Sequence, residues 1–239
     1  MKKVIGLLLA LAFTFSLGGC SPESSEGSGN PQGQETSATE EPGPSAGNAA
    51  EETTPPQQDG ESDILIAYFS WADNAVIDGE VDVVASPSVT SPGNVQQLAG
   101  WVQEETGGAL FSIQVTEPYS SGWDECLERA NGERAENARP ELTASVENME
   151  SYDTIFLGYP NWWYGAPMAV LSFLEDYDFS GKQVYLFCSH GTGGLANSVE
   201  DIRASMPGAN ISENIFDVYE ENAASSQEDI QSWLTELGY

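Results

Sequence analysis

Apolar and polar positions alternate along the chain in two distinct rhythms. Short apolar runs with the length and character of buried strands lie at 64–69, 110–115, 155–159, 184–188 and, more weakly, 211–218. Between and after them, apolar side chains recur at helical spacing, as in Val95, Leu98, Ala99 and Val102. Five strands alternating with five helices predict an α/β fold, a doubly wound five-stranded parallel sheet in a three-layer sandwich.

The N-terminal residues have the pattern of a leader and not of a folded element. Lys2 and Lys3 precede an apolar run, 4–17, that is too short to span a bilayer comfortably. The run ends in Leu-Gly-Gly-Cys20, which resembles the lipobox of bacterial lipoproteins. We therefore interpret 1–20 as a lipoprotein signal peptide with Cys20 as the lipidated residue; the alternative is an ordinary secretory signal. Either interpretation predicts an exported protein, and the first anchors it by lipid on the extracytoplasmic side of a bacterial membrane.

Residues 21–62 differ sharply in composition from the rest of the chain. These 42 residues contain no Val, Ile, Leu, aromatic residue, Lys or Arg. Such a segment has nothing to bury and cannot offset the entropy of ordering, so it is predicted to be a disordered acidic tether. A flexible coil of this length holds a domain about 35 Å from its anchor on average. Residues 63–239 are then expected to form one folded domain.

Charge in the predicted domain is strongly unbalanced. It holds 29 acidic residues against five basic ones, a net charge of about −24. This charge excludes nucleic acid and anionic lipid surfaces as natural partners, so the membrane is reached through the lipid anchor only. A redox or other protein partner of this surface is expected to be basic.

Cysteine and histidine usage argues against a metal or thiol centre. The domain contains Cys126, Cys188 and one histidine, His190, with no Cys-x-x-Cys motif. Cys188 lies in an apolar run, which favours unpaired, buried thiols over a disulfide.

Doubly wound sheets bind ligands at the carboxyl ends of their strands, where the strand order reverses. The loop after the first strand begins with Ser70 and Trp71 and reaches a helix that opens at Gly93-Asn94. Backbone N–H groups at a helix N-terminus suit an anion, and since the loop has no Lys or Arg, the donors would be neutral. The alternative is a plain strand-to-helix turn, although its length favours a function.

The other two loops have unusual compositions. The third strand runs into Pro160, Asn161, Trp162, Trp163 and Tyr164, and three successive aromatics cannot all be core residues of one short loop. At least one is expected at the mouth of a site, facing a flat ligand. The fourth strand runs into Ser-His-Gly-Thr-Gly-Gly at 189–194, where glycines let the backbone approach a ligand; the alternative is a flexible loop with an exposed histidine.

Together the three loops describe a flavin site, and their residues resemble a known family. Ile64 to Ser70, the run 152–163 and the run 188–195 are similar to the corresponding segments of the flavodoxin-like family, most closely its bacterial lipoprotein-type members. The resemblance covers nearly all of 63–239. It implies an FMN-binding redox protein with strand order 2-1-3-4-5.

The resemblance also assigns residues to parts of FMN. Around the phosphate it places Ser70, Asn74, Gly93, Asn94 and Val95, and it counts Trp71 among the cofactor-binding residues. Along the isoalloxazine ring it places Pro160, Asn161, Trp162, Trp163, Tyr164 and Gly165. Against the pyrimidine edge it places Ser189, His190, Gly191, Gly193 and Gly194. The family's phosphate loop is interrupted here by 71–93, so the loop is expected to be split between Ser70 and Gly93-Asn94. One tryptophan is expected to stack on the ring and the other to pack against the insertion.

Three functions follow from this interpretation. The first is an FMN-dependent electron carrier or oxidoreductase at the cell surface, in which the acidic surface lowers the reduction potential of the flavin. The second is a flavin-free flavodoxin-like domain that presents a binding surface. The third is a reductase of quinone-like or nitro compounds with a nicotinamide donor, for which the sequence shows no dedicated pocket.

Overall fold

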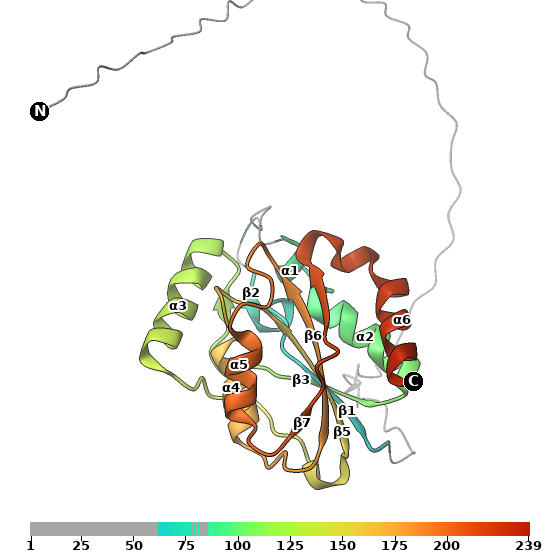
Figure 1. Ribbon diagram of the computed structural model, residues 1–239. Coiled ribbons are helices and arrows are strands. Elements are labelled where there is room, and N and C mark those ends of the chain that lie inside the picture. Colours follow the sequence, from blue (N-terminus) through green and yellow to red (C-terminus); the bar gives the residue numbers. More distant parts are fainter. Residues whose placement is uncertain (1–61, 78, 80, 82–85) are drawn as a thin grey trace, which may run out of the picture. The chain divides into compact units, whose positions relative to one another are not determined.

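The computed structural model describes residues 62–77, 79, 81 and 86–239 (Figure 1). The predicted signal peptide with Cys20 and all but the last residue of the predicted tether lie outside the described residues, so both stay predictions. Within the described part, no helix has the length and apolar character needed to cross a membrane.

Six strands pair in parallel into one central sheet (Figure 1). They are β1 (Ile64–Tyr68), β3 (Ala109–Ser112), β5 (Thr154–Pro160), β6 (Gln183–His190), β7 (Asn210–Ile211) and β8 (Phe216–Tyr219). The order is β3-β1-β5-β6, followed by β7 and β8, which both pair with β6. The five sheet positions therefore follow the expected 2-1-3-4-5 order.

The fifth position is split, where one continuous strand was predicted over 211–218. β7 pairs with the start of β6 and β8 with its end, and the chain leaves the sheet between them. The break coincides with Ser212 and Asn214, because the Ser212 hydroxyl accepts from the Asn214 N–H at 3.0 Å and closes a local turn.

Helices cover both faces of the sheet, as a three-layer sandwich requires. α2 (Asn94–Thr106) and α6 (Gln227–Leu237) pack on one face, while α3 (Trp123–Glu136), α4 (Met168–Glu175) and α5 (Ser198–Ser205) lie over the other (Figure 1). Strand β1 shows why the sequence reads as an unbroken apolar run. Ile64, Ile66 and Tyr68 belong to the α2/α6 cluster, and Leu65 and Ala67 to the opposite one, so both faces are buried.

The segment after β1 contains more structure than its sequence suggested. It forms η1 (Ala72–Asn74), β2 (Ala75–Val76) and the short α1 (Ser86–Val89). β2 pairs in parallel with β4 (Tyr119–Ser120), which makes a second, two-stranded sheet. The pairing ties the insertion to the segment that follows β3. Two further 3₁₀ turns, η2 (Met149–Ser151) and η3 (Glu220–Ser225), complete the described part.

Both cysteines of the described part are free and buried. Burial raises the pKa of the Cys126 thiol to about 12 and raises that of Cys188 as well. Neither thiol is therefore a ready nucleophile.

Candidate functional site

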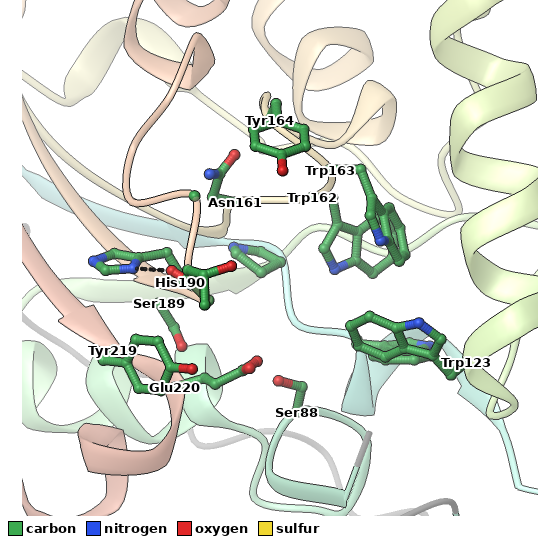
Figure 2. A pocket seen from close by; sticks show the side chains of 15 residues that line it. Ser88, Trp123, Asn161, Trp162, Trp163, Tyr164, Ser189, His190, Tyr219 and Glu220 are labelled. Atoms are coloured by element: carbon green, nitrogen blue, oxygen red, sulfur yellow. Dashed lines mark hydrogen bonds between the residues drawn. The ribbon is translucent and has the colours of Figure 1, made fainter. Parts of the chain in front are cut away.

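A pocket of about 310 Å³ opens at the carboxyl ends of β1, β5, β6 and β8 (Figure 2). This is the crevice where doubly wound sheets bind ligands, and the volume lies at the lower end of the range for small-molecule sites. Ten predicted site residues line it: Trp71, Pro160, Asn161, Trp162, Trp163, Tyr164, Ser189, His190, Gly191 and Gly193. The structure thus brings the three predicted loops together in one place.

The aromatic loop folds into a tight two-residue turn. Trp162 and Gly165 exchange two backbone hydrogen bonds, of 2.9 and 3.2 Å, around Trp163 and Tyr164. Both central residues have positive φ, 43° for Trp163 and 73° for Tyr164. That backbone conformation normally belongs to Asn and Gly, and bulky residues hold it at a cost of about 1–3 kcal/mol each. Two large rings are therefore kept in a strained turn at the mouth of the pocket.

An ion pair from the neighbouring helices anchors this turn. Arg134 Nη2 donates to the Ala166 carbonyl at 2.9 Å and to Asp201 Oδ2 at 3.0 Å, and the same carboxylate accepts from the Ala166 N–H. A Cβ on Gly165 would meet the Arg134 guanidinium at 1.7 Å, so a side chain there would displace Arg134 from this ion pair. Gly165 accordingly supports the turn from behind and does not line the pocket.

The two tryptophans have different environments. Trp162 is 8% exposed and meets Phe69, Tyr119 and Trp71 edge to face, with ring centroids 5.1, 5.0 and 5.8 Å apart. It is the one that packs against the insertion. Trp163 is half-buried, with its ring edge toward Trp123 at 5.7 Å. Trp163 and the 65%-exposed Tyr164 are thus the rings available to a flat ligand.

The opposite side of the pocket comes from β6 and β8 (Figure 2). His190 and Tyr219 are register partners at the ends of these strands. His190 Nδ1 lies 2.8 Å from the Gly191 carbonyl oxygen and Nε2 lies 2.9 Å from Asp217 Oδ2. Since both ring nitrogens already face acceptors, the histidine stiffens the 189–194 loop.

That loop also contacts the aromatic turn. The Asn161 amide Nδ2 donates to the Gly194 carbonyl, which turns Gly194 away from the pocket lining. The Asn161 Oδ1 atom is buried and has no partner among the described residues. An unpaired buried acceptor in a pocket wall is a ready contact for a ligand donor.

A candidate anion site lies where β1 meets α2. The Ser70 hydroxyl is buried, and its Oγ has no hydrogen-bond partner among the described residues. A Cβ on Gly93 would lie 2.7 Å from this oxygen and 2.6 Å from the Ser88 carbonyl oxygen, so the absence of a side chain at Gly93 lets Ser70 and Ser88 pack closely against the start of α2. The α2 N-terminus begins there, with its N–H groups and the positive end of its dipole.

The other residues predicted around the phosphate hold the structure in place. Asn74 uses its whole amide on backbone: Nδ2 donates to the carbonyls of Ser70 and Ile113, and Oδ1 accepts from the Val115 N–H. It has no donor left for an anion, so it orders the loop. The Val95 side chain is buried in the α2/α6 cluster, which leaves only its backbone facing the site.

Asn94 and Trp71 are also committed to protein contacts. Asn94 Nδ2 donates to the Glu220 carbonyl at 3.0 Å and to Ser189 Oγ at 3.4 Å, which joins α2 to β6 and η3. Trp71 is buried, and its Nε1 donates to the Ser120 carbonyl at 3.0 Å. Both side chains therefore hold together the elements around the pocket.

Four lining residues were not predicted from the sequence: Ser88, Trp123, Tyr219 and Glu220, whereas Thr192 lies within the predicted 189–194 loop. Tyr219 ends β8 and Glu220 follows it, and the rule about carboxyl strand ends applies to that strand too. Trp123 opens α3 and reads as a core position by its helical spacing. Ser88 lies in the insertion, where no sequence pattern identifies it.

Among the described residues that line the pocket, Glu220 is the one with a carboxyl group, and none is Lys or Arg. Burial, followed by the nearby Glu221, raises its pKa, while His190 acts in the opposite direction. The described pocket lining is therefore mainly aromatic, with Glu220 as its carboxylate and His190 as its imidazole.

The fold defines a flavodoxin-type α/β protein with a candidate ligand pocket at the carboxyl ends of its strands. The flavodoxin family profile matches residues 83–237, and the chain belongs to this family. No match was found among curated proteins.

Solved structures show the same relationship. A protein from Bacteroides eggerthii DSM 20697 called a flavoprotein is 26% identical, with a TM-score of 0.55, over 74% of this chain and 98% of its own. One from Bacteroides uniformis ATCC 8492 is 26% identical, with a TM-score of 0.56, over 72% and 97%. A flavoprotein in complex with FMN from Lactobacillus acidophilus NCFM is 17% identical, with a TM-score of 0.48, over 69% and 97%.

Proposed function

We propose that this chain is an FMN-binding redox protein that works in electron transfer or as an FMN-dependent oxidoreductase at the extracytoplasmic membrane surface. One observation carries the proposal: partly exposed aromatic rings line the switch-point crevice, and next to its lining residues Trp71 and Ser88 lies a buried, unpartnered hydroxyl, Ser70 Oγ, at the start of α2. Flat apolar rings and neutral anion donors in one crevice suit a ligand that is a heterocycle at one end and a phosphate at the other.

The described residues fit FMN part by part. Trp163 and Tyr164 are the rings that would cover the isoalloxazine system, and the backbone of 189–193 would face its polar edge. Ser70 Oγ and the first N–H groups of α2 would hold the phosphate. Bound FMN supplies the electron-transfer chemistry, while the chain binds, orients and shields it from water.

The proposal places the protein at a membrane surface through Cys20 and the tether. A long acidic tether leaves the domain free to meet a partner at some distance from its anchor. The acidic surface favours a basic redox partner and speeds its association at low ionic strength.

Thermal unfolding of the purified full-length chain tests the cofactor assignment. A ligand that binds only the folded state raises the unfolding midpoint. We expect FMN to raise the midpoint more than riboflavin does, because riboflavin lacks the phosphate that Ser70 and α2 would hold. Unchanged midpoints with both flavins would favour the second function, a flavin-free binding domain, for which the lack of cationic side chains in the described pocket lining is the supporting observation.

Rapid mixing with NADH or NADPH then separates a reductase from a carrier. A carrier that lacks a nicotinamide pocket is reduced slowly by either donor, and we expect this result. Fast, saturable reduction would instead assign the reductase function.

A further inference from the structure

Glu220 places a negatively charged side chain in a pocket that is proposed to bind a phosphate. It follows β8 as the first residue of η3, and its side chain extends into the pocket toward Ser88 (Figure 2). Its backbone carbonyl accepts from Asn94 Nδ2 at 3.0 Å, which ties it to the first residue of α2. The carboxyl group is thereby held at the same end of the pocket as the helix N-terminus.

Two independent features mark that end as the anion site. One is the start of the 13-residue helix α2, and the other is the buried Ser70 hydroxyl, whose Oγ has no partner among the described residues. Ser88 and Ser70 lie close together beside Gly93, because the Ser88 carbonyl oxygen and Ser70 Oγ lie 2.6 and 2.7 Å from where a Cβ on Gly93 would stand. Since the Glu220 side chain points toward Ser88, an anion held by Ser70 and the start of α2 would lie near the Glu220 carboxylate (Figure 2).

The described surroundings of Glu220 do not neutralise its charge with a direct ion pair. α1 and the start of α2 contribute Ser88 and Asn94, which do not titrate. Glu221, on the same element, adds negative charge. His190, on β6, has its Nε2 directed at Asp217 on β8. Tyr219, also on β8, adds a phenol to the same side of the pocket. Burial and Glu221 raise the pKa of Glu220, and His190 lowers it.

We propose that Glu220 is a specificity-determining residue of this site, whose ionised carboxylate weakens binding of the flavin phosphate. The inference rests on the proposed function, because it assumes that the site takes FMN. Like charges held close in a pocket of reduced dielectric repel by an amount that affects affinity severalfold. The phosphate of FMN is bound most tightly when the carboxyl is neutral.

The affinity for FMN is expected to depend on pH through Glu220. Protonation of Glu220 removes the repulsion, so FMN affinity rises as the pH falls and declines as the pH rises through the titration of this carboxyl. Riboflavin has no phosphate and escapes the repulsion. Glu220 therefore determines how strongly the site prefers FMN over riboflavin.

Fluorescence titration of the full-length chain with FMN and with riboflavin tests this. The variants are wild type, Glu220→Gln and the matched control Glu221→Gln, which removes the same charge one residue away, on an exposed side chain. At about pH 8 we expect Glu220→Gln to bind FMN about three- to tenfold more tightly than wild type, with riboflavin affinity little changed. Glu221→Gln is expected to change FMN affinity much less, and at about pH 5 the gap between wild type and Glu220→Gln narrows.

Equal FMN affinities of wild type and Glu220→Gln at about pH 8 would overturn the inference, as would an equal gain with Glu221→Gln. Failure of the wild type and of both variants to bind either flavin would instead reject the proposed function. The two failures give different results in the same experiment.

Discussion

At the scale of single residues, the two adjacent tryptophans of the aromatic loop have different roles, one in packing and one in the pocket. Trp162 lies in an edge-to-face cluster with Phe69, Tyr119 and Trp71, whereas Trp163 faces the pocket. We expect Trp162→Ala to lower the free energy of unfolding by about 3–5 kcal/mol, because it opens a cavity in a packed cluster. Trp163→Ala is expected to change stability less but to weaken FMN binding more than tenfold, since it removes a ring from the ligand side.

Urea unfolding and FMN titration of the two variants separate these roles. A Trp163→Ala protein that binds FMN like wild type, or a Trp162→Ala protein of wild-type stability, would contradict the division. The sequence predicted that one tryptophan stacks and one packs. It did not decide which, because the choice depends on the turn geometry that sends neighbouring side chains in different directions.

Ser70 gives a second residue-scale prediction. Its hydroxyl is buried without a partner among the described residues, so Ser70→Ala is expected to leave stability unchanged or slightly raised. FMN affinity is expected to fall about tenfold, because a hydrogen bond to a charged phosphate is lost. Riboflavin affinity, measured in parallel, serves as the control and should not change. An equal loss of affinity for both flavins would show that Ser70 does not contact the phosphate.

The residue types in the sequence predicted only part of the candidate anion site. The sequence placed Ser70 and Gly93 at the anion end, where the structure has a buried hydroxyl without a partner among the described residues, packed beside a glycine. It also placed Asn74 there, yet that amide is consumed by backbone contacts 39 and 41 residues away along the chain. Such long-range hydrogen bonds leave no local pattern, which is why the difference between ligand and scaffold could not be predicted.

At the scale of elements, the turn at Trp163-Tyr164 holds two bulky residues at positive φ. Replacing the pair by Asn-Gly suits this turn type, so we expect the apo protein to gain about 1–3 kcal/mol of stability. The same replacement removes both rings, and FMN binding is expected to be lost. Urea unfolding with FMN titration measures both effects. Reduced stability in the Asn-Gly variant would show that the rings contribute more to folding than the strain removes.

Strands and helices with strong periodicity were predicted correctly, and the weak ones were not. β1 is buried on both faces, so the run of six apolar residues at 64–69, which contains it, identified it. The predicted fifth strand is broken, because its pairing with β6 is made in two pieces. β2 and β4 are two residues each and depend on each other, so neither carries its own signal.

At the scale of the whole molecule, the excess of acidic residues is the dominant property, with a formal net charge of −31 over the full chain. A negative field disfavours electron addition at a bound flavin. We therefore expect the midpoint potential of bound FMN to lie below that of free FMN and to rise with salt, which screens the field. Redox titration at low and high ionic strength measures this. A midpoint at or above that of free FMN would contradict the expectation.

The central claim is that the crevice between the aromatic turn, the 189–194 loop and the start of α2 binds FMN. Titration of FMN fluorescence with the purified full-length chain tests it most directly, because a ring stacked between aromatic side chains is quenched. We expect saturable quenching with one site per chain, reduced in Trp163→Ala. FMN fluorescence that stays unchanged at micromolar protein would contradict it.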